Sequence, residues 1–147
     1  MSAPDIVLTD APSPADREAV LRGLIAFNTA QIGASGHRPL AVLIKQHGTV
    51  VGGLVGATMH RWCFVEWLFL PEGLRGGGLG TTLIRRAEDE ARRRDCIGIF
   101  LDTFDFQARG FYEKLGYVVF ATQTDYPPGH ARYFLQKRLG DRPADRL

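Results

Sequence analysis

The chain has 147 residues, 45% hydrophobic and 10% aromatic, which is enough to bury the core of one domain. Its 18 basic and 16 acidic residues give a formal net charge of +2, and this balance argues against a nucleic-acid partner, because proteins that bind nucleic acids carry a clustered basic patch. No apolar run approaches the length of about 18 residues that a membrane span needs, and residues 1–10 lack the features of a signal peptide, so we expect a cytoplasmic protein without a membrane partner.

The first part of the chain predicts one short strand and one helix. The strand is an apolar run at residues 6–8. Ser13, Pro14 and Asp16 are typical of a helix start, since serine caps the N-terminus and proline and an acidic side chain suit the first turn. The helix that follows carries an apolar stripe, formed by Val20, Leu21, Leu24, Ile25 and Phe27.

The middle of the chain predicts three successive strands. The β-rich runs lie at residues 40–45, 49–59 and 62–70 and are joined by short turns, which favours antiparallel pairing. Glycines that favour a bulge interrupt the second run, at Gly52, Gly53 and Gly56.

The next part predicts a strand-helix-strand crossover. Apolar residues recur every four positions in a helix from Leu79 to about Arg94, which connects the third β-rich run to a strand at residues 97–102. A crossover of this kind makes the two strands that it joins parallel. The remaining elements are a short helix and two strands, at residues 108–115, 118–120 and 132–138. The fold class is therefore α/β, with a mixed sheet, mostly antiparallel but with one parallel pair, flanked by helices.

A glycine-rich run precedes the long helix and consists of Arg75, Gly76, Gly77, Gly78, Leu79 and Gly80. Glycines leave main-chain N–H groups open to a ligand, and a helix start offers unpaired donors and a partial positive charge, so we expect an anion to bind there. A nucleoside-triphosphate loop would need a lysine after its last glycine, and a dinucleotide fingerprint would need a glycine in place of Thr81. Both of these nucleotide sites are therefore disfavoured.

A second motif lies further along the chain. Ala108, Phe111, Tyr112 and Leu115 place an apolar stripe on one face of the short helix, and Gly116 suits its C-terminus. Together, the two motifs resemble those of the GNAT family of acyl-CoA-dependent N-acetyltransferases. The glycine loop of that family has the form Arg/Gln, any, any, Gly, any, Gly/Ala, and its later helix carries a Phe-Tyr pair before a Leu-Gly-aromatic ending.

The resemblance implies a site for coenzyme A. In GNAT proteins the loop amides bind the coenzyme A pyrophosphate, and the pantetheine arm bonds to the main chain of a strand that splays away from its parallel neighbour. By position, the pantetheine contacts fall on Leu68, Phe69 and Leu70. The pyrophosphate contacts fall on the loop and the first turn of the helix, at Arg75, Gly76, Gly77, Gly78, Leu79, Gly80 and Thr81. The resemblance thus implies acetyl-CoA as the cosubstrate.

Acetyl transfer to an amine needs one group that removes a proton from the ammonium and one that gives a proton to the departing thiolate. Glu66 shares strand parity with Phe64 and Leu68, so its carboxylate stands on a face that otherwise reads as buried, which suits a general base. An ion pair with an arginine, or exposure at the sheet edge, is the competing interpretation. Tyr112 matches the family tyrosine near the cofactor sulfur, which implies a general acid, although a core tyrosine would show the same pattern.

Several nearby residues have two interpretations. Asp102 could hold a water or a substrate ammonium or could cap a turn, and the turn is favoured. Asp105 and Gln107 stand in the neighbourhood where many family members carry an asparagine that helps to bind the cofactor, which puts that contact in doubt. The segment 125–130 could border the acceptor pocket or form a plain tight turn. Four aromatic residues could line an acceptor site or belong to the core, namely Trp62, Trp67, Phe104 and Phe106.

These observations predict an N-acetyltransferase that moves the acetyl group of acetyl-CoA to a primary amine of a small molecule or peptide, by direct transfer in a ternary complex. The alternative is a coenzyme A-binding sensor or scaffold without catalysis. We expect one acetyltransferase domain over residues 1–140, a frayed tail over 141–147, and a homodimer favoured by exposed edge strands. Cys63 and Cys96 lie in apolar runs, and neither they nor the scattered histidines have metal-ligand spacing, so we predict reduced core cysteines and no metal site.

Overall fold

The computed structural model describes residues 2–140, and the chain divides into two compact units, Met1–Ser35 and Gly36–Leu147. The predicted tail at 141–147 lies outside the described residues. The first unit contains helix α1, Pro14–Ile32. Its predicted start is confirmed, because the Ser13 hydroxyl accepts a hydrogen bond from the Asp16 N–H at 3.1 Å and the Asp16 carboxylate accepts one from the Ser13 N–H at 3.0 Å.

The predicted strand at residues 6–8 is wrong. These residues adopt neither helix nor strand in the structure, and this unit offers no second strand to complete a ladder. No residue of α1 is buried, so the core of the protein belongs to the second unit.

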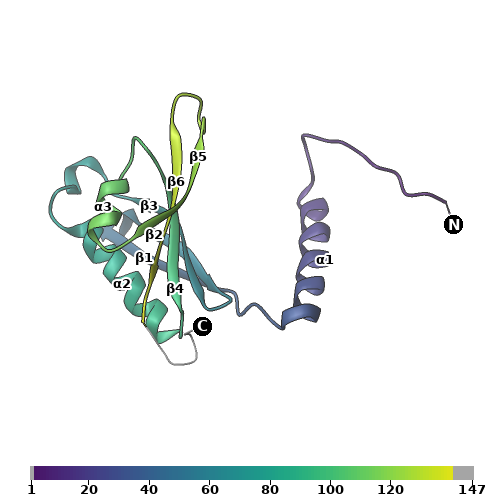
Figure 1. The fold of residues 1–147 in the computed structure, drawn as a ribbon, viewed down its shortest axis with the longest axis horizontal. Helices are drawn as coiled ribbons and strands as arrows, with labels where there is room; N and C mark the ends of the chain where they lie inside the picture. The colour runs from purple at the N-terminus through teal and green to yellow at the C-terminus, as the bar shows by residue number, and fades with distance from the viewer. Residues whose placement is uncertain (1, 141–147) are drawn as a thin grey trace. The chain divides into compact units, whose positions relative to one another are not determined.

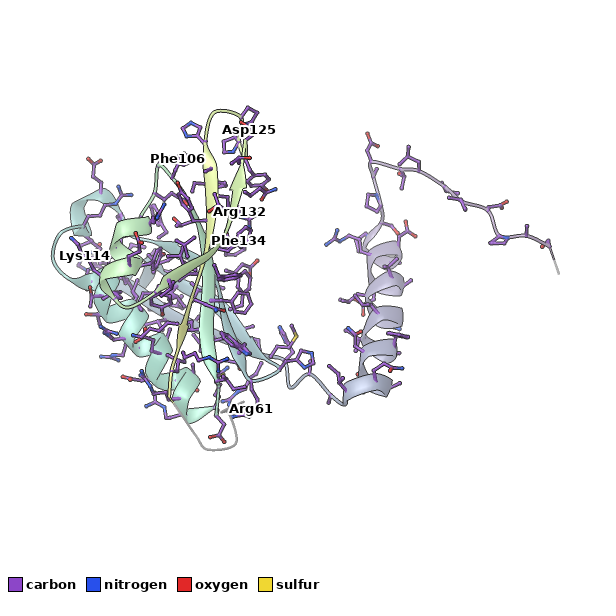
Figure 2. All side chains as sticks on the ribbon, in the orientation of Figure 1. Arg61, Phe106, Lys114, Asp125, Arg132 and Phe134 are labelled. Carbon is purple, nitrogen blue, oxygen red and sulfur yellow. The ribbon has the colours of Figure 1, made fainter. Side chains whose placement is uncertain are left out.

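The second unit is built on a six-stranded sheet with the strand order β1-β2-β3-β4-β6-β5 (Figure 1). Every neighbouring pair is antiparallel except β3 and β4, which confirms the predicted mixed sheet. The strands are β1 (Arg38–Gln46), β2 (Thr49–Met59), β3 (Trp62–Phe69), β4 (Gly98–Phe104), β5 (Val118–Thr124) and β6 (Ala131–Arg138). Arg132 and Phe134 are two positions apart on β6 and share one face of the sheet (Figure 2).

The helices of this unit lie at the crossover and after β4. A short 3-10 helix, η1 (Glu72–Leu74), and helix α2 (Leu79–Arg93) connect β3 to β4, and helix α3 (Arg109–Lys114) connects β4 to β5. The predicted stripe of α2 is buried against the sheet, and its core members are Leu83, Ile84, Ala87 and Ala91. They pack with buried strand residues, among them Leu54, Cys63, Val65, Ile99, Leu101 and Leu135. Burial of this apolar surface holds α2 and the glycine loop before it in place.

Strands β3 and β4 pair over only part of their length. The ladder runs from Trp62↔Gly98 to Val65↔Leu101, and both strands continue beyond it. They therefore splay apart, as the family resemblance implied. The register of β3 against β2 also shifts here, because Val55 pairs with Trp67 whereas Gly56 pairs with Val65, which leaves Glu66 as the extra residue of a bulge.

A buried glutamate ties the helices to the sheet. Glu88 of α2 is fully buried, and its carboxylate accepts hydrogen bonds from Arg85 Nη1 at 2.9 Å, Tyr117 Oη at 2.8 Å and Lys137 Nζ at 3.0 Å. Lys137 also donates to the Leu115 carbonyl at the C-terminus of α3. Burial alone would raise the pKa of Glu88, but these hydrogen bonds hold the pKa below its ordinary value. The network fixes the end of α3 against α2.

Candidate active site

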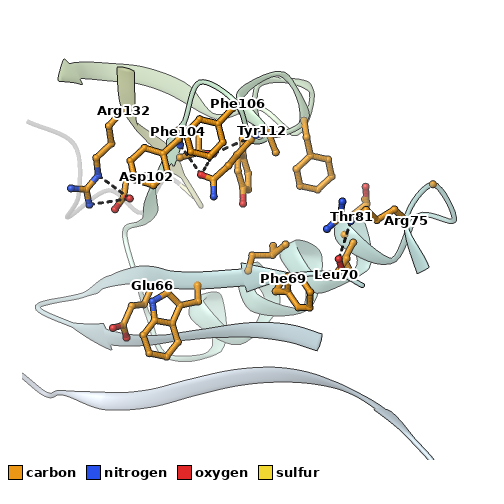
Figure 3. A pocket seen from close by; sticks show the side chains of 18 of the residues that line it. Glu66, Phe69, Leu70, Arg75, Thr81, Asp102, Phe104, Phe106, Tyr112 and Arg132 are labelled. Carbon is orange, nitrogen blue, oxygen red and sulfur yellow. Dashed lines mark hydrogen bonds and ion pairs between the residues drawn. The ribbon is translucent and has the colours of Figure 1, made fainter. Parts of the chain in front are cut away.

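A cavity of about 1100 Å³ opens where β3 and β4 separate (Figure 3). Four segments line it, which are the end of β3, the glycine loop with the start of α2, the end of β4 with the loop after it, and helix α3. Arg132 of β6 completes the wall. The glycine loop and the α3 motif, which are far apart in the sequence, therefore line the same cavity.

The glycine loop leaves its main chain uncovered on the cavity side. Gly76 and Gly78 have positive φ angles of 84° and 85°, and a Cβ atom added at Gly76, Gly77 or Gly78 would meet no atom of the protein within 4 Å. Gly80 has a different role, because a Cβ there would lie 3.1 Å from the Phe111 ring. The first three glycines therefore leave room for a ligand, whereas Gly80 allows α2 to pack against α3.

The start of α2 offers unpaired donors to this space. Thr82 N–H bonds to the Gly78 carbonyl at 3.1 Å, but across residues 2–140 no hydrogen bond engages the N–H groups of Leu79, Gly80 or Thr81. The first turn holds no acidic side chain, so the positive end of the helix is not neutralised there. This arrangement fits the pyrophosphate of coenzyme A. Of the predicted loop contacts, Gly77 and Leu79 do not line the cavity.

The predicted pantetheine contacts lie along the free edge of β3. Leu68, Phe69 and Leu70 line the cavity and follow the point where pairing with β4 ends. Every second residue of a strand turns its N–H and C=O groups toward a given edge, so this edge can pair with an amide-bearing chain. The Leu70 carbonyl already accepts a hydrogen bond from Arg75 Nε at 2.9 Å. Arg75 therefore braces the glycine loop against the end of β3.

Tyr112 stands between the two walls of the cavity (Figure 3). Its side chain is 6% exposed, and no hydrogen bond to its hydroxyl occurs within the described part of the chain. Burial, with a smaller contribution from the Asp102 carboxylate, raises the pKa of Tyr112 to about 12. The phenol is therefore protonated at neutral pH, and its O–H is available as a donor.

Glu66 lines the cavity, but the predicted burial is wrong, because the side chain is exposed. The β3 bulge is the physical reason. Alternation places Cys63 and Val65 in the core, and the extra residue shifts the pattern so that Leu68 also packs against the core while Glu66 does not. The sequence cannot show this shift, since it depends on the register with β2.

Asp102 does not cap a turn, so the favoured sequence interpretation is wrong. It lies inside β4, and its Oδ1 accepts a hydrogen bond from Arg132 Nε at 3.0 Å and forms an ion pair with Arg132 Nη2 at 3.0 Å. The reason is register, because β4 and β6 pair so that the two residues share one face of the sheet. Asp102 and Arg132 both line the cavity, and the sequence analysis missed Arg132, which is separated from Asp102 by a helix and a strand.

The aromatic candidates divide between the cavity and the sheet. Trp67, Phe104 and Phe106 line the cavity, whereas Trp62 packs edge-on against Phe100. Gln107 also lines the cavity, and its side-chain oxygen accepts hydrogen bonds from Phe104 N–H at 2.7 Å and Thr103 Oγ1 at 3.2 Å, which fixes the loop that leads into α3.

The described residues contain no group of three or more His, Cys, Asp and Glu side chains arranged for a metal ion. None of the helices in residues 2–140 combines the length and apolar character of a membrane span. Cys63 and Cys96 are buried and belong to the hydrophobic core, so the predicted core position of both is confirmed, and burial raises the pKa of Cys63 to about 12.

Comparisons with known proteins agree with this geometry. Residues 6–117 match the family model described as the acetyltransferase (GNAT) family. The chain is 45% identical over 107 residues to blasticidin-S acetyltransferase of Streptomyces morookaense, covering 69% of this chain and 79% of that protein. It is 36% identical over 136 residues to acetyltransferase Atu2258 of Agrobacterium fabrum, covering 92% of this chain and 99% of that protein. A crystal structure of an Agrobacterium tumefaciens protein superposes with a TM-score of 0.88 at 36% identity, covering 91% of this chain and 98% of that chain.

Proposed function

The chain belongs to the GNAT acetyltransferase family, and we propose that it transfers the acetyl group of acetyl-CoA to the primary amine of a small molecule or peptide. The observation that carries this proposal is the single cavity in which the open glycine loop, the free edge of β3 and the hydroxyl of Tyr112 meet. We assign the activity to residues 1–140.

The proposed acetyl-CoA site uses main chain more than side chains. The N–H groups at the start of α2 and the uncovered loop would hold the pyrophosphate, and the main chain of Leu68 and Phe69 would hold the pantetheine arm. When bound, acetyl-CoA supplies the thioester carbonyl that an amine attacks. A volume of about 1100 Å³, at the upper end for small-molecule sites, supports binding of this arm and an acceptor together.

Tyr112 is proposed as the general acid. Its hydroxyl points into the cavity, keeps its proton because the pKa is about 12, and would donate that proton to the departing thiolate. The competing interpretation, a core tyrosine, accounts for its burial but not for a hydroxyl without a partner in the described chain.

Glu66 is proposed as the base, acting directly or through a water. Its exposure permits proton exchange with solvent, and it lines the same cavity as Tyr112. Glu66→Gln should lower the rate about tenfold or more, and most strongly at the acidic end of the pH range, where fewer amines are neutral. If the ratio of the two rates, parent over variant, is the same at every pH, Glu66 is not the base.

Direct transfer in a ternary complex is favoured over an acyl-cysteine route. The chain has two cysteines, both buried in the core, and neither lines the cavity. Burial raises the pKa of both thiols, so they are protonated at neutral pH and are weak nucleophiles.

The first acceptor to test is blasticidin S, because a relative that is 45% identical carries the name blasticidin-S acetyltransferase. The measurement is thiol release from acetyl-CoA in the presence of blasticidin S, other small amines and N-terminal peptides. Release with any of them supports the proposal and identifies the acceptor class. Binding of acetyl-CoA without release across the panel would favour the alternative, a sensor or scaffold.

A further inference from the structure

A stack of three aromatic rings borders the cavity. The Phe104 and Phe106 rings lie 5.2 Å apart at an interplanar angle of 13°, and the Phe104 and Tyr126 rings lie 5.7 Å apart at 20°. These separations are typical of offset stacking. Phe106 ends the stack and lines the cavity, and its side chain is 58% exposed.

Polar contacts hold this stack in place. Asp105 is bonded through Oδ1 to His130 Nδ1 at 2.9 Å, and its Oδ2 accepts from Ala131 N–H at 2.9 Å, which fastens the loop after β4 to the β5–β6 hairpin. The His130 and Phe106 rings make a T-shaped contact, with centroids 5.1 Å apart. Phe106 is therefore held by stacking on Phe104 and by the contact with His130, and a ligand would meet an ordered ring.

Contact with the hairpin does not account for the whole Phe106 ring. Phe104 stacks on Tyr126 of the hairpin, and Phe106 touches the hairpin through His130, yet Phe106 is more than half exposed and lines the cavity. An exposed aromatic ring at the end of an ordered stack can bind the aromatic ring of a ligand, which would extend the stack by one ring.

The charges nearby suit an amine. Arg132 is neutralised by Asp102 at 3.0 Å, and Glu66, on the opposite wall, forms no ion pair within residues 2–140. The end of the cavity that contains the stack thus carries a net negative charge from these groups, which favours a cationic or neutral amine over an anionic molecule.

We propose that Phe106 binds a flat, conjugated ring of the acceptor, and that the acceptors of this protein are therefore amines that carry an aromatic or heteroaromatic ring. This inference rests on the proposed acetyl transfer. The ring stacks on the outer face of Phe106, and the amine reaches from there toward Tyr112 and Glu66.

The test compares two amines of similar size, one with a planar aromatic ring and one with a saturated ring. Phenethylamine and its cyclohexyl counterpart are titrated calorimetrically into the full chain with saturating coenzyme A, so that no turnover occurs. Stacking predicts that phenethylamine binds about three- to tenfold more tightly. Apolar burial alone predicts the opposite order or none, because the saturated ring is at least as hydrophobic.

Matched variants assign the preference to Phe106. Phe106→Leu should bring the affinity ratio close to one, and Phe106→Trp, which keeps a flat face, should retain it. Phe120→Leu is the control, since Phe120 is 52% exposed on β5 and does not line the cavity, and it should leave the ratio unchanged. Equal affinities in the parent, a preference that survives Phe106→Leu, or binding of neither amine would each overturn the proposal.

The same samples separate this inference from the proposed function. Coenzyme A binding and thiol release are measured in parallel, and the amine titration is repeated without coenzyme A. Thiol release without a ring preference contradicts only the role of Phe106. Absence of coenzyme A binding contradicts the proposed function, and the titration without coenzyme A still reports whether the stack selects a flat ring.

Discussion

The two ends of the cavity are built by different means. The end proposed for acetyl-CoA, here the cofactor end, consists of main chain, with glycines at the start of α2 and the free edge of β3, and its geometry is fixed by backbone conformation. The end proposed for the amine, here the acceptor end, consists of side chains from three separate segments, which are held to one another by ring stacking and by the bonds of Asp102 and Asp105. Main-chain recognition suits one constant cosubstrate, whereas a wall of side chains can vary with the acceptor.

Tyr112 lies between the two ends and should show the largest effect. Tyr112→Phe removes the proton donor and is expected to lower kcat about ten- to a thousandfold, with the affinity for acetyl-CoA nearly unchanged because the cofactor end uses main chain. Steady-state kinetics with a parallel binding titration measure both quantities. An unchanged kcat would exclude Tyr112 from the chemistry.

Glu88 is buried and does not line the cavity, so its replacement should affect the stability of the fold. Glu88→Gln leaves Lys137 without its buried counter-charge and should lower the free energy of unfolding by about 1–3 kcal/mol at neutral pH. Because the folded-state pKa is lowered from 4.5, this contribution is complete above the unfolded pKa and is lost as the pH falls through the folded value. Urea unfolding at several pH values should therefore show the parent and the variant converging in acid. A constant difference would contradict the network.

An alanine substitution in the glycine loop tests whether the cofactor end binds acetyl-CoA. Gly78→Ala adds a Cβ in the open space assigned to the pyrophosphate and should weaken acetyl-CoA binding about tenfold. Gly48→Ala is the matched control, because Gly48 also has a positive φ, of 78°, and open surroundings, but lies in the β1–β2 turn. Both variants carry the backbone strain, so equal affinities for acetyl-CoA would argue against the loop as the site.

The smallest effect is expected at the acceptor end. Asp105→Asn keeps an acceptor for Ala131 N–H but removes the charge that faces His130. Since exposed ion pairs contribute little, the KM for a ring-bearing amine should rise less than about threefold, with the KM for acetyl-CoA unchanged. A larger change in the KM for acetyl-CoA would mean that Asp105 serves the cofactor end.

Local patterns in the sequence predicted the features that depend on local structure. Ser13 and Asp16 marked the start of α1, and the crossover between β3 and β4 gave the parallel pair. Gly116 was expected at the C-terminus of the short helix and has a positive φ of 97° there. Each of these features could be predicted because it depends on residues close together in the sequence.

Features that depend on pairing between distant strands were not predictable. The bulge that places Leu68 and Glu66 on different faces arises from the register of β3 with β2, and the Asp102–Arg132 pair arises from the register of β4 with β6. The run at residues 6–8 has strand character but no partner in its own unit. Register depends on the packing of the whole sheet, which a single sequence does not display.

The decisive measurement is a thermal-shift titration of the protein with acetyl-CoA, free coenzyme A, ATP and NAD in parallel. A ligand that binds only the folded state raises the melting temperature as its concentration exceeds its Kd. The loop and the splayed strands predict that acetyl-CoA and coenzyme A raise it, while ATP and NAD do not. No rise with the coenzyme A species, or an equal rise with ATP or NAD, would contradict the assignment of the cavity to acetyl-CoA.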